Sequence, residues 1–302
     1  MIRREFLSLS GKAGAAACLP FSAFPLQESF TRPEPKFKMG YQLFSIRDEM
    51  AKDPLATLKA LQAMGYEDFE HYGFDAENGT YYGYAASEFK TILDDLGLSV
   101  SSGHYPFSDF LAQPLDNIRD YTSRCIEGAL AVGSKYITWP WLAEDLRNAD
   151  GFKRCAQFLN MMGEQIRAAG LVLAYHNHGY EFEDLGGTTG YDIITSETDE
   201  RVVKLQLDMY WLARSSDYTP QEIIDKHRGR FVMWHIKDMH KETDDYTELG
   251  NGSIDYTQLL PDPKSSGLEY YYIEQGGNFT VDSMTSARVS AAYLKEHLQQ
   301  FL

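Results

Sequence analysis

The feature that most constrains this chain is an alternation of short apolar runs and amphipathic segments, which begins at residue 37 and continues to the C-terminus. The apolar runs are predicted to be strands, because they are short, contain many β-branched or aromatic residues, and are separated by Gly, Pro or polar residues. The eight expected strands are 37–46, 66–73, 98–106, 134–141, 171–178, 204–211, 231–239 and 268–275.

Between these runs, apolar residues recur at helical spacing, and several of the segments end at a Gly that can stop a helix. The expected helices are 53–65, 85–97, 115–133, about 150–170, a short one near 190, one from about 219, a short one near 255 and a last one from 282. Strands joined by helical crossovers lie parallel in one sheet. Eight such units favour an α/β fold of the (β/α)8 TIM-barrel type over an open doubly wound sheet, and no Gly-x-Gly-x-x-Gly follows the first strand.

The N-terminal segment is expected to lie outside this domain. Residues 1–26 begin with Arg3 and Arg4 and continue into an Ala-rich apolar stretch, which is typical of a twin-arginine export signal. We expect a linker at 27–36 and a catalytic domain at 37–302, exported to the periplasm.

Membrane attachment is less well supported by the sequence. Cys18 follows three Ala residues, but Ala15 stands where a lipoprotein signal usually has Leu, so lipid anchoring is the weaker alternative. No later segment has the roughly 18 apolar residues that a transmembrane helix requires. Cys125 and Cys155 lie in expected helices and are predicted to be buried free thiols, although an oxidising compartment would permit one bridge.

Charge restricts the class of partner. The formal net charge of −16 would repel a phosphate backbone, so nucleic acid is not an expected ligand. The 20 Tyr, 17 Phe and 4 Trp residues suit sugar rings as well as a protein core. Homo-oligomer formation stays open on sequence grounds.

Polar side chains collect at the ends of the expected strands. In a TIM barrel the C-terminal ends of the strands carry the active residues, so these side chains are candidates for one site. They are Glu70, His71, His104, His176, Asn177, His178, Asp208, His235, Lys237, Asp238, Glu274 and Gln275.

Three of these residues suggest a metal site. Asp208, His235 and Glu274 come from consecutive strands, so they can be aimed at one point near the barrel axis. Mixed oxygen and nitrogen donors suit Mn²⁺, Mg²⁺, Co²⁺, Fe²⁺ or Zn²⁺. The alternative is a buried network of ion pairs that includes Lys237.

The motifs LDMYW, HIKDMH, IEQ and YHNHGYEF together resemble the sugar phosphate isomerase/epimerase family of xylose-isomerase-like barrels, a group that also contains the AP endonuclease family 2 enzymes. The resemblance covers essentially the whole chain from GYQLFSIRD onward. It implies a divalent metal held by Glu, Asp, His and Glu from strands five to eight. Carried over, Asp208, His235 and Glu274 are three of these ligands.

The fourth ligand departs from the family pattern, because His176 stands where a glutamate usually precedes Asn-His. Either His176 binds the metal or Glu181, three residues past His178, folds back to replace the missing carboxylate. We favour Glu181 as the ligand, because hard divalent cations prefer oxygen.

The resemblance implies a sugar isomerase or epimerase that acts through a metal-stabilised enediolate. Glu274 is expected to transfer the proton, His176 to provide a second proton-transfer group, and Lys237 to hold a substrate oxygen. The expected substrate contacts are His104, Asn177, His178, Lys237 and Trp139.

The expected substrate is an unphosphorylated sugar or keto-sugar, because no arginine accompanies the small backbone cradle at Gly276, Gly277 and Asn278. Two alternatives stay open. One is a metal-dependent lyase or hydrolase of oxidised (3-keto) glycosides, or a keto-sugar dehydratase, for which a histidine opposite one strong base is suited. The other is a sugar-binding barrel without catalytic activity.

Overall fold

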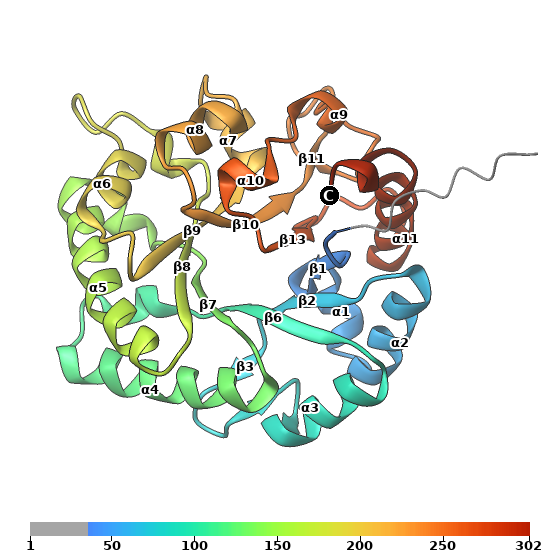
Figure 1. Cartoon of the computed structure of the whole chain (residues 1–302), viewed down its shortest axis with the longest axis horizontal. Coiled ribbons are helices and arrows are strands. Elements are labelled where there is room, and N and C mark those ends of the chain that lie inside the picture. The colour runs from blue at the N-terminus through green and yellow to red at the C-terminus, as the bar shows by residue number, and fades with distance from the viewer. Residues whose placement is uncertain (1–35) are drawn as a thin grey trace, which may run out of the picture. The chain divides into compact units, whose positions relative to one another are not determined.

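The computed structural model describes residues 36–302, and these form a closed barrel of eight parallel strands with helices outside it (Figure 1). The predicted export signal and, apart from Lys36, the predicted linker lie outside the described residues. Around the barrel the strands follow in the order β1 (Gly40–Gln42), β2 (Asp68–His71), β6 (Ser99–His104), β7 (Tyr136–Trp139), β8 (Val172–His176), β9 (Val203–Asp208), β10 (Phe231–Ile236) and β13 (Tyr270–Ile273). The predicted TIM barrel is confirmed, and each of its strands lies within one of the eight predicted runs, except that β9 begins one residue earlier.

Two predicted strands extend too far. Residues 43–46 were expected to continue the first strand, but they form the 3-10 helix η1 (Leu43–Ile46), because the Gln42 side chain accepts a hydrogen bond from the Phe44 backbone N–H at 3.0 Å. Likewise β9 ends at Asp208, whose carboxylate accepts from the Trp211 backbone N–H at 3.0 Å and starts α7 (Met209–Ser215). In both cases a side chain at the strand end caps a helix, which is a typical N-terminal cap.

Each predicted helix has a counterpart in the structure. These counterparts are α2 (Pro54–Met64), α3 (Ala86–Asp95), α4 (Leu115–Val132), α5 (Ala149–Ala168), α6 (Gly190–Glu197), α8 (Pro220–Lys226), α9 (Tyr256–Leu259) and α11 (Ser283–Tyr293). Gly65 and Gly133 end α2 and α4 with φ angles of 96° and 76°, a left-handed conformation that strongly favours glycine. Figure 1 shows α3, α4 and α5 outside β6, β7 and β8.

Short elements occupy the connections. They are α1 (Arg47–Met50), η2 (Phe107–Phe110), η3 (Glu144–Leu146), η4 (Tyr180–Phe182), α10 (Pro263–Ser266), the π-helical turn η5 (Leu294–Leu298), η6 (Gln299–Phe301), a three-stranded sheet of β3 (Phe74–Asp75), β4 (Thr80–Tyr81) and β5 (Tyr84–Ala85), and the pair β11 (Asp238–Met239) and β12 (Tyr246–Thr247). The two small sheets were not predicted from sequence, because strands of two residues carry no alternation of polar and apolar positions.

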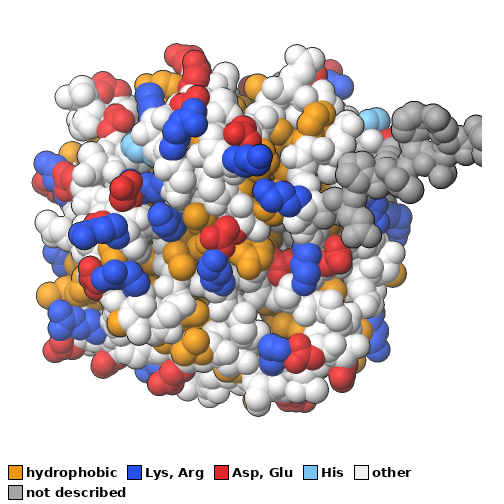
Figure 2. All heavy atoms as spheres, in the orientation of Figure 1, with side chains coloured by type: hydrophobic (Ala, Val, Ile, Leu, Met, Phe, Trp, Pro, Cys, Tyr) orange, Lys and Arg blue, Asp and Glu red, His pale blue; other side chains and the backbone are white. Residues whose placement is uncertain are grey.

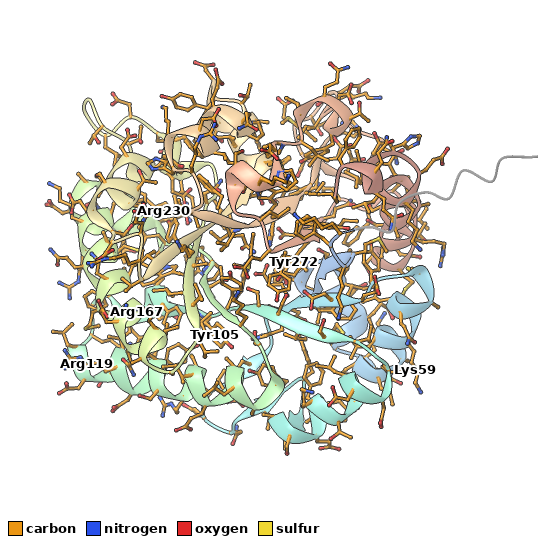
Figure 3. All side chains as sticks on the ribbon, viewed as in Figure 1. Lys59, Tyr105, Arg119, Arg167, Arg230 and Tyr272 are labelled. Carbon is orange, nitrogen blue, oxygen red and sulfur yellow. The ribbon has the colours of Figure 1, made fainter. Side chains whose placement is uncertain are left out.

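The barrel interior is apolar at one level and polar above it. Tyr136, Ala174, Val232, Met233 and Tyr272 form a small buried cluster, and Figure 3 shows Tyr272 within the ring of strands. The main core lies between strands and helices, and it includes Cys125 and Cys155, which are free buried thiols as predicted.

The surface of the described residues carries charges of both signs. On the face in Figure 2, lysine, arginine and acidic side chains are interspersed between small apolar areas. Within residues 36–302, no helix is both long and apolar enough for a membrane span.

Candidate active site

Ligand-type side chains meet at the C-terminal ends of β8, β9, β10 and β13, which follow one another around the barrel. One ligand atom from each of four residues lies within 4.8 Å of the others, and these residues are His176, Asp208, His235 and Glu274. We call these four residues the ligand cluster. The sequence prediction that Asp208, His235 and Glu274 converge is therefore correct in geometry, and His176 is the fourth member.

Asp208 is held by both its backbone and its side chain. Asn177 Oδ1 accepts a hydrogen bond from the Asp208 N–H at 2.9 Å, and Asn177 Nδ2 donates to the Asp208 carbonyl at 3.3 Å. The Asp208 Oδ1 atom caps α7 at Trp211, so Oδ2 is the atom directed at the cluster. The amide of Asn177 is thus used to fix the end of β9, and the substrate contact predicted for it stays a prediction.

His235 lies between two carboxylates. Its Nε2 atom is 2.5 Å from Glu70 Oε2, and its Nδ1 atom is 2.6 Å from Glu274 Oε2. Burial alone would lower the pKa of His235, but Glu70 and Glu274 raise it to about 10. Burial would raise the pKa of both carboxyls, yet their cationic neighbours hold each well below its usual value.

Lys237 contributes a second cation. Its Nζ atom lies 2.9 Å from Asp208 Oδ2 and 2.9 Å from Glu274 Oε2, and the side chain is 2% exposed. Burial would lower the pKa of Lys237, but the two carboxylates raise it, so the ammonium is retained. The structure therefore places Lys237 against the ligand cluster, and its predicted contact with a substrate oxygen stays a prediction.

His176 is the candidate fourth ligand. It is buried, and among the described residues its Nδ1 atom has no hydrogen-bond partner. Burial, followed by the charge of His235, holds the pKa of His176 well below its usual value, so the imidazole is neutral and keeps a free lone pair. A neutral imidazole beside two carboxylates and a second histidine is a donor set that fits a divalent transition metal or zinc.

Glu181, which we favoured as the fourth ligand, is turned away from the cluster. Its Oε1 atom accepts from the Tyr175 hydroxyl at 2.8 Å and its Oε2 atom from the His178 backbone N–H at 2.8 Å. Since η4 folds this carboxyl behind β8, only His176 of the two candidates lies with Asp208, His235 and Glu274. Burial raises the pKa of Glu181 to about 7.

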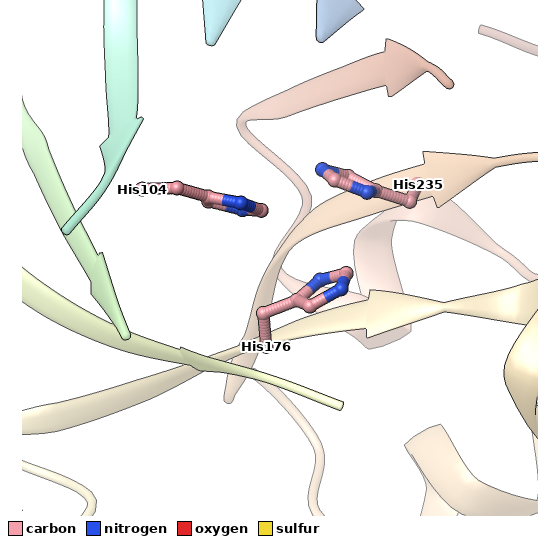
Figure 4. Close-up of side chains that lie close together, drawn as sticks. All are labelled: His104, His176 and His235. Carbon is pink, nitrogen blue, oxygen red and sulfur yellow. The ribbon is translucent and has the colours of Figure 1, made fainter. Parts of the chain in front are cut away.

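Three histidines point toward one another above the barrel interior. Figure 4 shows His104, His176 and His235 approaching from β6, β8 and β10, with ring centres 4.6 to 5.6 Å apart. His104 Nε2 is 3.1 Å from both Gln206 Oε1 and Glu70 Oε2. This arrangement places His104 beside the ligand cluster, where the sequence predicted a substrate contact.

A cavity of about 330 Å³ opens onto the cluster. It is lined by Phe44, Tyr72, His104, Pro106, Pro140, Trp141, His176, His178 and Glu274. His104 and His178 are therefore placed to contact a ligand, as are the two predicted proton-transfer groups His176 and Glu274. Trp139, expected to stack on a sugar, is instead fully buried in the main core, and Trp141 lines the cavity.

Glu70 supports the site in a way that sequence reasoning did not predict. Its completely buried carboxylate accepts hydrogen bonds from Ser102 at 2.6 Å, Gln42 at 2.7 Å and Gln206 at 2.8 Å, in addition to its contact with His235. The sequence did place Glu70 near the end of β2 among the candidate residues. Side chains alternate along a strand, so only one of Glu70 and His71 can point into the barrel, and the sequence does not say which. His71 points outward, where its Nε2 atom lies 3.1 Å from the Tyr105 hydroxyl.

Known proteins share the fold of this chain. Residues 58–285 match the family model described as xylose isomerase-like TIM barrel. A sugar phosphate isomerase/epimerase from Parabacteroides distasonis ATCC 8503 superposes with a TM-score of 0.75 at 24% identity, over 91% of this chain and 99% of that chain. An L-ribulose 3-epimerase superposes with a TM-score of 0.64 at 17% identity, over 87% of this chain and 95% of that chain. The IOLI protein, whose structure was solved with a bound zinc atom, superposes with a TM-score of 0.64 at 13% identity, over 88% of this chain and 99% of that chain. No curated protein matches this chain.

Proposed function

The chain belongs to the xylose isomerase-like TIM-barrel family, and on that premise we propose that it is a divalent-metal-dependent isomerase or epimerase of an unphosphorylated sugar or keto-sugar. The observation that carries the proposal is the ligand cluster itself. His176, Asp208, His235 and Glu274 bring four suitable donor atoms together, and two of these residues, His176 and Glu274, line a cavity. The Nε2 atom of His176 lies 3.9 Å from Asp208 Oδ2, and its Nδ1 atom lacks a hydrogen-bond partner among the described residues.

These four residues would hold the metal. Glu70 contacts Nε2 of His235, and this contact would keep the other ring nitrogen, Nδ1, directed at the metal. When bound, a divalent cation would polarise the carbonyl of the sugar and acidify the neighbouring C–H group. The remaining steps belong to the protein side chains that face the cavity.

Glu274 is the proposed base. It lines the cavity, and its side chain is 11% exposed, so a substrate can reach its carboxylate. Lys237 and His235 hold the pKa of Glu274 well below its usual value despite burial, which keeps the group ionised and able to accept a proton. Removal of the proton next to the carbonyl gives an enediolate, and return of the proton to the other carbon or the other face gives the isomer or epimer.

The sequence predicts a second proton-transfer role for His176, which also lines the cavity. While its lone pair holds the metal, the imidazole cannot accept a proton, so this role would apply only to a His176 that is not a ligand. His104 and His178 are proposed to bind sugar hydroxyls from the same cavity.

The lining of the cavity supports an unphosphorylated substrate. Among the described residues, those that line it include neither lysine nor arginine. None of these lining residues would offer a phosphate group an ammonium or guanidinium partner.

A second candidate function is elimination from an oxidised glycoside. It is favoured by His176, because a histidine replaces a carboxylate at the fourth position of the cluster. In that reaction His176 would not be a metal ligand: in its protonated form it would donate its proton to the departing oxygen while Glu274 removes the C–H proton.

We also propose that the enzyme is exported from the cytoplasm. The Arg3–Arg4 pair and the Ala-rich stretch support export by the twin-arginine route to the periplasm. An exported enzyme would act on sugars outside the cytoplasm, which agrees with an unphosphorylated substrate.

Deuterium exchange tests the proposed chemistry. Purified protein, loaded with Mn²⁺, Co²⁺ or Zn²⁺ or stripped by chelation, is incubated in D₂O with a panel of aldoses, ketoses and 3-keto-glycosides. We expect deuterium at a carbon next to the carbonyl only with the metal-loaded protein, and release of an aglycone alongside exchange would select elimination. Equal exchange by stripped and loaded protein, or none with either, would contradict the proposal.

A further inference from the structure

The mouth of the barrel is divided into two chemically different halves. The strands β8, β9, β10 and β13 supply the ligand cluster, whereas the strands β1, β2, β6 and β7 are followed by apolar residues, beyond His104 at the end of β6. Phe44 follows β1, Tyr72 follows β2, Pro106 follows β6, and Pro140 and Trp141 follow β7. We call these five residues the aromatic rim, and all five line the same cavity as His176 and Glu274.

The rim presents large apolar surfaces to solvent. Phe44 is 40% exposed and Trp141 is 37% exposed, although most other aromatic side chains of the described residues are buried. Because the rim lines the cavity that contains Glu274, a ligand that fills this cavity contacts both the rim and the cluster.

The rim is also held in place before any ligand arrives. The ring of Phe44 meets that of Tyr72 edge-on with centres 5.4 Å apart, and the Arg47 guanidinium lies 4.3 Å from the Phe44 ring centre. The Trp141 carbonyl accepts a hydrogen bond from Trp139 Nε1 at 2.7 Å. Such preorganisation reduces the entropy lost when a ligand binds.

One link joins the rim to the ligand cluster. Gln42 accepts from the Phe44 backbone N–H through Oε1 and donates to Glu70 through Nε2. Glu70 in turn contacts His235, so the position of Phe44 is coupled to that of the cluster.

We propose that the aromatic rim is a subsite for a second ring, so that the substrate is a glycoside of a keto-sugar, whose keto-sugar ring lies at the ligand cluster and whose aglycone stacks on Trp141 and Phe44. This inference rests on the proposed function for the position of the first ring. Flat apolar faces suit aromatic side chains, and both an aryl group and a second sugar offer such a face.

Calorimetry with matched ligand pairs tests the subsite on the metal-loaded protein. The probes are the phenyl glycosides and β-1,4-linked glucosyl derivatives of glucose, galactose, xylose and mannose, each in its 3-keto form. Each is compared with the 3-keto methyl glycoside of the same sugar. For at least one sugar we expect the second ring to improve affinity about fivefold to tenfold, a gain typical of one aromatic contact. Whichever of the phenyl and glucosyl series gains more identifies the aglycone class.

Variants locate the gain on the rim. Trp141→Ala and Phe44→Ala should abolish most of it, whereas Trp141→Phe should retain part. Phe301→Ala is the matched control, since Phe301 is 44% exposed but does not line the cavity. Circular dichroism checks that each variant is folded.

The outcomes separate this inference from the proposed function. No gain for any second ring, or a gain that survives both alanine variants, overturns the subsite. If binding depends on the rim but no deuterium is exchanged, the subsite is supported and the proposed chemistry is overturned. If deuterium is exchanged but binding does not depend on the rim, the proposed chemistry is supported and the subsite is overturned.

Discussion

Glu70 Oε2 lies 2.5 Å from Nε2 of His235, and both side chains are completely buried. This contact crosses the barrel from β2 to β10. It leaves Nδ1 as the histidine nitrogen that faces Glu274 and Asp208. A carboxylate bonded to the second nitrogen of a histidine fixes the ring and its tautomer, an arrangement that recurs in metal sites.

Replacing Glu70 with Gln should weaken metal binding without removing a ligand. The change keeps the shape of the side chain but removes the charge that orients His235. We expect a loss of about 10-fold to 100-fold in metal affinity, the usual range for such supporting residues. Competition with a fluorescent chelator measures the affinity. Glu269→Gln, which alters a surface pair with Lys135, is the control and should match the wild type.

Variants of His176 and Glu181 are expected to differ in metal content. His176→Ala should reduce bound metal at least tenfold, since one of four clustered donors is removed, and His176→Glu should restore binding with a carboxylate. Glu181→Gln should leave the metal content unchanged, because its carboxyl is bonded to Tyr175 and to the His178 backbone. Elemental analysis after dialysis measures all three, and a metal-free Glu181→Gln variant would reverse the assignment.

Glu181 should also make stability depend on pH. Burial raises the pKa of Glu181 from its usual 4.5 to about 7, so the folded state binds a proton more tightly than the unfolded state does. This contribution is fully present below about pH 4.5 and is lost as pH rises through 7, by up to ~3 kcal/mol for a shift of this size. Urea unfolding between pH 5 and 8.5 should show this loss in the wild type and a flatter profile in Glu181→Gln. Parallel profiles for the two proteins would count against a titrating Glu181.

Asp238 should hold the loop after β10 in place. Its carboxylate accepts backbone N–H groups of Met239, Gly250, Gly252 and Ile254 at 2.8 to 3.2 Å. Asp238→Ala leaves these donors without their acceptor, and we expect a loss of about 3 kcal/mol in the free energy of unfolding.

Hydrogen exchange measured by mass spectrometry should show faster exchange across residues 239–254 in Asp238→Ala. Asp245→Ala in the same loop is the control, because Asp245 accepts only the Tyr246 N–H through its side chain in the described structure. Unchanged protection of the loop in Asp238→Ala would contradict the assigned role.

The fold could be predicted from sequence because its signals are repeated. Eight apolar runs alternate with helical segments, and several helices end at a Gly such as Gly65 or Gly133. Where strands end was harder to predict, because Gln42 and Asp208 act through side-chain caps that an apolar pattern does not reveal.

The sequence could predict which strand ends carry the candidate site, but not which side chain at each strand end points into the barrel. Adjacent residues of a strand point to opposite sides, so Glu70 faces the barrel interior while His71 faces outward, and Trp139 is buried while Trp141, beyond the strand end, lines the cavity. Glu181 was misplaced because the 3-10 helix η4 sets its direction, and a residue count from His178 does not contain that information.

Anomalous diffraction from crystals soaked in Mn²⁺ tests the central claim most directly, because the Lys237 ammonium and a metal ion compete for the space beside Asp208 and Glu274. We predict one peak about 2.0–2.4 Å from a donor atom of each of His176, Asp208, His235 and Glu274, with Lys237 displaced from at least one carboxylate. No peak at saturating Mn²⁺, with Lys237 still bridging Asp208 and Glu274, would contradict the account.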